Sequence, residues 1–164
     1  MRNTEAINQK ILNLKQAEQF MQTARMLGKT VAFTNGCFDI LHEGHIFSLS
    51  QAANEADYLI VAVNADASVK KLKGESRPIN NQQTRAHLLA SLMVTDAVII
   101  FEEDTPQKLI ATLLPDVLVK GGDYTIAQVA GATEVIANGG RVIINPLLAG
   151  FSTTGIIQKI HSLG

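Results

Sequence analysis

The feature that most constrains the fold is a regular alternation of short apolar runs with longer amphipathic stretches. The apolar runs are residues 30–34, 58–63, 97–101, 117–119 and 142–144. Runs that are apolar throughout are typical of strands buried on both faces, and helices between such strands connect them in parallel. The sequence therefore predicts an α/β fold with a doubly wound parallel sheet of five strands, covered by helices on both faces.

Length and composition indicate a single domain, residues 1–164, in which residues 1–28 form an N-terminal helical extension that stops at Gly28. Charged residues make up 18% of the chain and its formal net charge is −1, which gives no general attraction to nucleic acid or membranes. The single cysteine, Cys37, excludes an internal disulfide and indicates a reduced thiol. No apolar run is long enough to cross a membrane and the N-terminus lacks a signal-peptide core, so we expect a cytoplasmic protein.

Polar clusters follow four of the predicted strands. They are residues 34–36 after the first strand, 64–73 after the second, 120–123 after the fourth and 150–154 after the fifth. Within the second cluster, Asn64 or Asp66 is expected to cap the following helix. In a doubly wound sheet the carboxyl ends of the strands share one edge, where ligands bind at the switch in strand order. We therefore expect the clusters after the first and fourth strands to flank one cleft.

The most informative cluster continues through a turn into a helix start at residues 36–45. Gly36 allows a sharp turn, and the free N–H groups at the start of the next helix form a phosphate site. His42 and His45 are three residues apart and lie on one face, with Gly44 between them clearing space for a ligand. Two imidazoles placed there can donate hydrogen bonds to a phosphate in the transition state. Taken alone, the pair is more simply two surface histidines, and its spacing is one residue short of a zinc-protease motif.

Residues 34–45 (TNGCFDILHEGH) resemble the first signature of the HxGH nucleotidyltransferases, in their cytidylyltransferase-like branch. Residues 150–154 (GFSTT) resemble the second signature of that family. Residues 72–79 and 115–124 are similar to its heptose-1-phosphate adenylyltransferase branch, the nucleotidyltransferase half of ADP-heptose synthase. The resemblance covers about residues 28–160 and implies a Rossmann-like fold of the HUP nucleotidyltransferase type.

That resemblance implies an enzyme that transfers an adenylyl group from ATP to a sugar 1-phosphate and releases pyrophosphate, with Mg²⁺ accompanying ATP. The chain is too short to hold a sugar kinase as well, so a separate kinase would phosphorylate the sugar. Leu147 and Leu148 stand where related glycerol-3-phosphate cytidylyltransferases have an arginine, which argues against that substrate. The alternatives are a cytidylyltransferase for glycerol 3-phosphate or another small phosphorylated alcohol, and a nucleotide-binding sensor without turnover.

The resemblance and the expected cleft together suggest three sets of site residues. The catalytic set is His42, His45 and Lys73, and no protein ligand for the metal is predicted. The nucleotide-binding set is Thr34, Asn35, Gly36, Cys37, Phe38, Gly44, Lys120, Gly121, Asp123, Ser152, Thr153 and Thr154. Lys70 and Arg77 are candidate substrate-binding residues. Simpler interpretations stay open: residues 152–154 as helix caps, 121–123 as a β-turn and 70–73 as a solvated basic turn.

Two further expectations concern assembly and motion. A segment resembles the subunit contact of related transferases, which implies a homodimer. The alternative is that the same sequence pattern comes from an ordinary core helix and strand. The segment is residues 85–101, with Arg85, Leu89, Leu92, Val94, Asp96 and Val98. Residues 70–80 combine three lysines with a glycine and few apolar anchors, so we expect a mobile loop that closes over both substrates.

Overall fold

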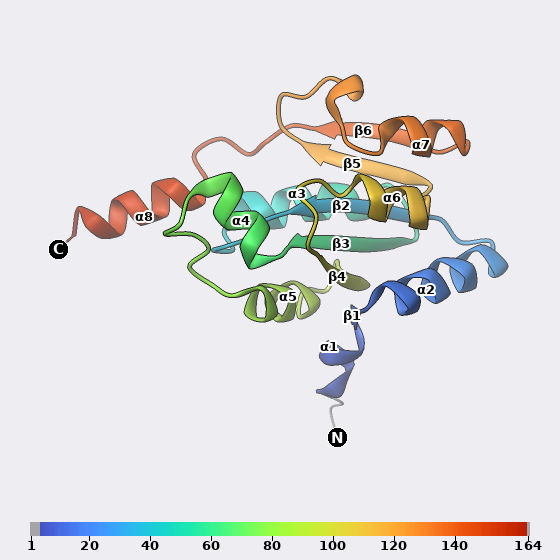
Figure 1. Cartoon of the computed structure of the whole chain (residues 1–164), viewed down its shortest axis with the longest axis horizontal. Coiled ribbons are helices and arrows are strands. Elements are labelled where there is room, and N and C mark those ends of the chain that lie inside the picture. The colour runs from blue at the N-terminus through green and yellow to red at the C-terminus, as the bar shows by residue number, and fades with distance from the viewer. Residues whose placement is uncertain (1–3, 164) are drawn as a thin grey trace.

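The structure, a computed structural model, describes residues 4–163 and contains one parallel sheet of six strands with helices on both faces (Figure 1). The strands are β1 (Ile11–Leu12), β2 (Val31–Gly36), β3 (Tyr58–Asn64), β4 (Ala97–Phe101), β5 (Val117–Gly121) and β6 (Arg141–Asn145). The helices are α1 (Glu5–Gln9), α2 (Leu14–Met26), α3 (Glu43–Ala53), α4 (Asp66–Lys73), α5 (Gln82–Ala90), α6 (Gln107–Leu113), α7 (Ala132–Ala137), α8 (Thr153–His161) and the 3₁₀ helix η1 (Ile126–Gln128). The predicted doubly wound α/β fold is confirmed.

The strand order is β1-β4-β3-β2-β5-β6, and every neighbouring pair is parallel. The chain builds outward from β2 through β3 to β4, then crosses back and adds β5 and β6 on the other side of β2. The switch in strand order therefore lies between β2 and β5, which are the first and fourth strands of the sequence prediction. A crevice forms there because the two connecting helices leave in opposite directions.

The hydrophobic core consists of two layers, one on each face of the sheet. Alternate residues of a strand point to opposite faces, so β2 and β3 contribute to both layers. Phe33 and Ile60 pack on the face covered by α2, α6 and α7. Ala32 and Val61 pack on the face covered by α3 and α5. Burial on both faces explains why these strands are apolar throughout.

The edge strand β1 is the main departure from the predicted fold. One helix was expected over residues 1–27, but the described part of this stretch holds α1, then β1 paired with β4, then α2. The ammonium of Lys10 holds β1 at the edge, since it donates to the Thr95 carbonyl oxygen at 2.6 Å. Asn13 then starts α2 afresh by accepting from the Gln16 N–H at 3.0 Å, in a reciprocal capping box. The apolar residues of this stretch keep a helical spacing, so the sequence pattern does not reveal the strand between α1 and α2.

The segment expected to form a subunit contact lies mostly inside the chain. Arg85, Leu89 and Val98 are fully buried, which makes them core residues of this protomer. Asp96 is also engaged, because its carboxylate accepts from the Leu59 N–H at 2.8 Å. For these residues the structure favours the alternative of an ordinary core helix and strand.

The last helix, α8, extends away from the body of the molecule toward the C-terminus (Figure 1). None of its residues is buried. Within residues 4–163, no helix combines the length and the apolar character needed to cross a bilayer.

Candidate active site

A cleft of about 660 Å³ opens at the carboxyl ends of the strands, on both sides of the switch between β2 and β5. The predicted site residues that line it are Thr34, Asn35, Gly36, Cys37, Phe38, His42, Gly44, His45, Lys73, Arg77, Lys120, Gly121, Ser152, Thr153 and Thr154. Of the described residues proposed for the site, Lys70 and Asp123 alone are outside this lining, and both are exposed. Residues that lie far apart in the sequence thus meet at one edge of the sheet.

His42 and His45 form a stacked pair at the start of α3. His42 is the N-cap, and its extended backbone turns its ring toward that of His45. The two rings stack with their centroids 3.8 Å apart and their planes at 20°. Phe38 meets the His45 ring edge-on at 5.3 Å, and the Phe151 ring lies nearly parallel to His42 at 6.5 Å. The two phenylalanines support the imidazole pair from either end.

Gly44 makes this arrangement possible. A Cβ added at Gly44 would lie 3.0 Å from the Cβ of Phe151 and 3.1 Å from the His42 ring. Part of the space that Gly44 was expected to clear for a ligand is therefore occupied by Phe151. This residue lies between the start of α8 and the histidines. A larger residue at this position would press against Phe151 and the His42 ring.

The histidine pair is uncharged at neutral pH. Burial, together with the neighbouring His42, lowers the pKa of His45 to about 4, against an opposing effect of the Ile40 backbone. Burial also lowers the pKa of His42. Neutral imidazoles act on a phosphate as hydrogen-bond donors rather than as cations. A bound phosphate would favour the charged forms and raise both pKa values.

We expect acidification to destabilise the protein through His45. The pKa of His45 falls from 6.5 to about 4 on folding, so between these values the unfolded state binds more protons. The stability associated with neutral His45 is complete above pH 6.5 and is lost progressively as the pH falls toward 4. Urea unfolding at about pH 7.5 and about pH 5 measures the effect. The midpoint should fall further in the wild type than in His45→Gln, which cannot titrate.

The control for this measurement is His87→Gln, which removes an exposed histidine of α5. This variant should lose stability with pH as the wild type does. Equal losses in the wild type and in His45→Gln would show that His45 does not carry the effect.

Arg77 lines the cleft, but its guanidinium is already engaged. Its Nε donates to Asp39 Oδ2 at 2.6 Å, and Asp39 is 1% exposed. The N–H groups of Ile79 and Asn80 donate to the same carboxylate at 2.8 and 2.9 Å. Burial alone would raise the pKa of Asp39, but the hydrogen bonds from Asn80, Ile79 and Arg77 outweigh it and lower the pKa. Arg77 thus holds the loop after α4 against the turn that precedes the histidines.

Arg85 makes a second connection to the same turn. It is fully buried, and its Nη1 donates to the Cys37 carbonyl oxygen at 2.6 Å. Its Nε donates to the Asn80 carbonyl oxygen at 2.9 Å, and its Nη2 pairs with the Asp66 carboxylate at 2.7 Å. One side chain therefore joins the turn after β2, the start of α4 and the start of α5.

These connections shorten the loop expected over residues 70–80. Helix α4 continues to Lys73, and residues 77–80 are tied to Asp39. Only residues 74–76 join the two parts, and all three are exposed. The segment available for a closing movement is therefore much shorter than the sequence suggests.

Lys120 brings a partly desolvated cation into the cleft from the end of β5. Burial lowers its pKa, while the nearby Cys37 opposes that change. Its Nζ lies 5.4 Å from the centroid of the Tyr124 ring. Burial raises the pKa of Cys37 despite four cations in its surroundings, so Cys37 stays a thiol at neutral pH. A lysine with little water around it attracts a phosphate more strongly than a solvated one.

The start of α8 supplies the hydroxyl residues. Ser152 is the N-cap, and its Oγ accepts from the Gly155 N–H at 3.0 Å. The capping role left open in the sequence is therefore real for Ser152. Because Thr153 and Thr154 also line the cleft, this helix start is still directed at the same space as the histidines.

Several cleft residues were not assigned to the site from the sequence. They include Ser48, Asn64, Leu72, Asp104, Thr105, Tyr124, Leu147, Leu148 and Phe151. The expected capping role of Asn64 or Asp66 is wrong, since Ala65 is the N-cap of α4 and no side chain caps it. The sequence feature that could have identified Asn64 as a cleft residue is its position at the end of a buried strand.

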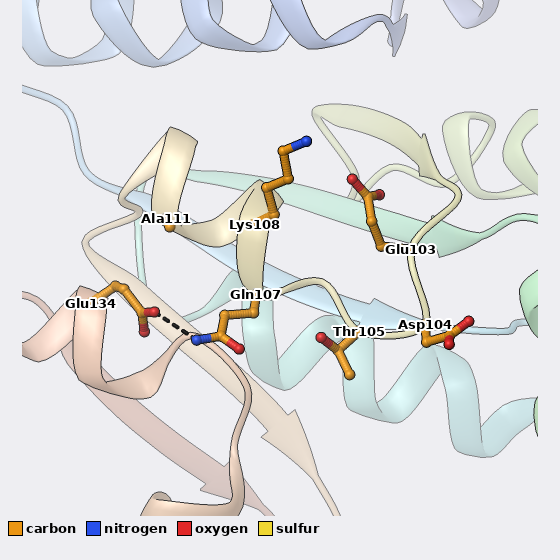
Figure 2. Close-up of a pocket in the computed structure, with 7 residues that line it drawn as sticks. All are labelled: Glu103, Asp104, Thr105, Gln107, Lys108, Ala111 and Glu134. Carbon is orange, nitrogen blue, oxygen red and sulfur yellow. Dashed lines mark hydrogen bonds between the residues drawn. The ribbon is translucent and has the colours of Figure 1, made fainter.

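A second recess lies beside α6 (Figure 2). Its volume is about 440 Å³, and its lining is Glu103, Asp104, Thr105, Gln107, Lys108, Ala111 and Glu134. The Gln107 amide donates to the Glu134 carboxylate at 2.8 Å and ties α6 to α7 (Figure 2). Within residues 4–163, no group of three or more His, Cys, Asp or Glu side chains is arranged to hold a metal. We place the chemistry in the larger cleft.

Comparison with known proteins adds to this geometry. The Cytidylyltransferase-like family pattern matches residues 33–159. The chain is 51% identical to the bifunctional protein HldE of Rhodospirillum rubrum over 156 residues, which are 95% of this chain and 32% of that protein. It is 53% identical to bifunctional protein HldE of Haemophilus ducreyi over 153 residues, 93% of this chain and 32% of that protein. The chain thus spans about a third of the length of these relatives.

Two solved structures share the fold. The lipopolysaccharide core biosynthesis protein from Thermoplasma volcanium aligns with a TM-score of 0.61 and 28% identity, over 74% of this chain and 98% of that one. Pantoate-beta-alanine ligase from Francisella tularensis aligns with a TM-score of 0.59 and 18% identity, over 93% of this chain and 77% of that one. This second likeness concerns the fold alone. From the matched family pattern and the histidine pair at the strand switch, the chain belongs to the cytidylyltransferase-like family of nucleotidyltransferases.

Proposed function

We propose that the chain transfers an adenylyl group from ATP to a sugar 1-phosphate, with heptose 1-phosphate as the substrate, and releases pyrophosphate. The observation that carries this proposal is the stacked pair of His42 and His45 in a cleft that also holds Lys73, Lys120 and the start of α8. The choice of a heptose rests on the identity to proteins named bifunctional protein HldE. The similarity of residues 72–79 and 115–124 to the heptose branch points the same way.

The mechanism requires positioning and charge neutralisation. The phosphate of the sugar is already an anionic nucleophile, so no general base is needed. One of its oxygens attacks the α-phosphorus of ATP, and the bond to the outgoing pyrophosphate breaks on the opposite side. His42 and His45 donate to α-phosphate oxygens, whose charge grows in the transition state. The start of α8 and Lys120 neutralise the pyrophosphate.

ATP would enter as its Mg²⁺ complex. The two carboxylates among the described cleft residues, Asp39 and Asp104, are paired with Arg77 and Lys71. The remaining polar lining is rich in imidazoles, lysines and hydroxyls. Such a lining suits an ion held by phosphate oxygens and waters, because Mg²⁺ keeps much of its hydration when it binds with a nucleotide.

Pyrophosphate release tests the proposal directly. The assay combines ATP, CTP or GTP in turn with heptose 1-phosphate, another sugar 1-phosphate and glycerol 3-phosphate. Release with ATP and a sugar 1-phosphate supports adenylyl transfer, and release with CTP and glycerol 3-phosphate would support the cytidylyltransferase alternative. Nucleotide binding without any release would leave the sensor alternative, against which the presence of both histidines argues.

We expect Lys73→Ala to lower kcat/KM about 10- to 100-fold, the loss typical of one hydrogen bond to a charged group. Lys73 is the last residue of α4 and lines the cleft, so it can reach the phosphates. Lys70→Ala is the matched control, because it removes the same charge from the same helix outside the cleft. This control should stay near the wild-type value in the pyrophosphate assay. Similar losses in both variants would indicate a general charge effect and count against Lys73.

The same proposal extends to assembly and location. We propose a homodimer, whose contact would use exposed residues of the 85–101 segment such as Leu88 and Met93 in place of the buried ones. We also propose a cytoplasmic location, because the reaction uses ATP. A separate sugar kinase would supply the phosphorylated sugar.

A further inference from the structure

Asn64 is a buried polar side chain in the cleft whose role the mechanism above leaves open. It ends β3 and is 4% exposed, yet it lines the cleft. A buried amide is costly unless its polar atoms find partners. Its contacts therefore show which of its two ends is left for a ligand.

The amide group of Asn64 is oriented by a short chain of hydrogen bonds. Its Nδ2 donates to Ser68 Oγ at 3.0 Å, and Ser68 Oγ in turn donates to the Glu103 carbonyl oxygen at 3.3 Å. A carbonyl oxygen can only accept, so the single hydroxyl proton of Ser68 is used there. Ser68 is 1% exposed and offers Asn64 only lone pairs, which requires the NH₂ end of Asn64 to face it.

The carbonyl oxygen of Asn64 is therefore the end that remains. Among residues 4–163 no donor is in hydrogen-bond contact with Asn64 Oδ1, and this oxygen is not sealed off as a buried atom without a partner. Asn64 thus presents a hydrogen-bond acceptor to the cleft. Such an oxygen favours a ligand hydroxyl and disfavours phosphate oxygens, which also only accept.

Asn64 ends β3, which lies on the other side of β2 from β5 and β6. The end of β2 carries the histidines, with β5 and β6 leading to α8 on one side and β3 and β4 on the other. In-line transfer puts the attacking phosphate and the leaving pyrophosphate on opposite sides of the α-phosphorus. If pyrophosphate occupies the start of α8, the β3 and β4 side of the histidines, where Asn64 lies, remains for the sugar phosphate.

Two other residues that line the same cleft suit a phosphorylated sugar. Lys73 comes from α4, and Thr105 comes from the connection between β4 and α6 (Figure 2). Lys73 is suited to the phosphate, whereas the Asn64 oxygen and the Thr105 hydroxyl are suited to hydroxyl groups. A cation beside neutral polar groups matches a ligand that carries both a phosphate and hydroxyls.

We infer that Asn64 is a specificity-determining residue, whose Oδ1 accepts a hydrogen bond from one hydroxyl of the sugar phosphate, with Ser68 as the positioning residue that orients it. This inference rests on the proposed function and deepens it, because it selects a sugar phosphate that carries this hydroxyl over an analogue that lacks it. A site built to bind a hydroxyl rejects analogues that lack it, since its own buried group is then left unpaired.

The test uses the wild-type enzyme, Asn64→Ala and Ser68→Ala with ATP, a sugar 1-phosphate that the wild type turns over, and its single-deoxy analogues. We expect Asn64→Ala to lower kcat/KM for the sugar phosphate about 10- to 100-fold, with the KM for ATP nearly unchanged. With the wild type, kcat/KM for one deoxy analogue should be lower than for the parent sugar phosphate by a similar factor. With Asn64→Ala, kcat/KM for this analogue and for the parent sugar phosphate should be equal. Ser68→Ala should show a smaller loss, again for the sugar phosphate alone. Asn138→Ala, which removes an exposed amide outside the cleft lining, is the matched control.

Equal kcat/KM values for the sugar phosphate in the wild type and in a folded Asn64→Ala would overturn the inference and leave the proposed function standing. If Asn64→Ala does not fold, the wild type decides alone, since equal use of every deoxy analogue would also overturn it. A parallel rise in the KM for ATP would assign Asn64 to a general structural role and overturn it as well. Absence of pyrophosphate release by the wild type with every sugar phosphate would remove both proposals.

Discussion

We expect His45→Ala to lower turnover about 10²–10³-fold, the loss typical of removing one donor to a developing oxyanion. His45 is uncharged at neutral pH and sits in the cleft beside His42. A neutral donor adds little to the binding of ATP in its ground state and more as charge grows on the α-phosphate. The KM for ATP should therefore change much less than kcat, which steady-state pyrophosphate release measures.

The variant must be shown to fold, because His45 also supports the stack with Phe38 and His42. Far-ultraviolet circular dichroism and the urea midpoint provide that check. His87→Ala is the matched control, since it removes an exposed histidine outside the cleft lining. Near-normal turnover in a folded His45→Ala protein would remove His45 from the catalytic set.

The second large effect is expected at Asp39, where Asp39→Ala should lower the free energy of unfolding by about 3–5 kcal/mol. The carboxylate is 1% exposed and accepts from Arg77 Nε, Ile79 N–H and Asn80 N–H. Its removal leaves a guanidinium that is 13% exposed without its partner, and the N–H groups of Ile79 and Asn80 lose their acceptor. Urea unfolding at neutral pH measures the loss.

Asp57→Ala is a close control for Asp39→Ala. Like Asp39, Asp57 accepts from one cation and two neutral donors, which are Lys29, the Thr30 N–H and the Thr30 hydroxyl, each at 2.9 Å. Its side chain is 37% exposed, so water can replace these partners, and the loss should be much smaller than for Asp39→Ala. Losses of the same size in both variants would contradict the view that burial makes the Asp39 pair important.

Asp39 also links stability to the site. It follows Phe38, which supports the His45 ring, and it holds the chain just beyond Lys73 through Arg77. The turn that carries the histidines and the end of α4 are thereby held in one arrangement. Asp39→Ala should therefore lower activity at temperatures where it is still folded, although Asp39 has no role in the chemistry.

Much of the fold could be read from local patterns. Each of the strands β2 to β6 contains an uninterrupted apolar run of at least three residues, which is the pattern expected of strands covered on both faces. The edge strand β1 could not be predicted, because a strand of two residues is too short to show the alternating pattern of side chains. It is set by its pairing with β4, 87 positions away in the sequence, and by the Lys10 ammonium, whose partner Thr95 is 85 positions away.

The sequence by itself determined the parallel sheet, its binding edge and the cluster around His42 and His45, because strand burial, glycine turns and helix starts depend on residues close together in the chain. Only the tertiary structure decided how the charged and polar side chains are used. From the sequence, Arg77 is a candidate substrate-binding residue and Arg85 a candidate subunit-contact residue, yet they bind the Asp39 and Asp66 carboxylates. Asn64 looks like a helix cap, yet it faces the cleft. The partner of a long side chain is one of the groups that folding brings close to it, and these groups cannot be predicted from the residues next to it in the sequence.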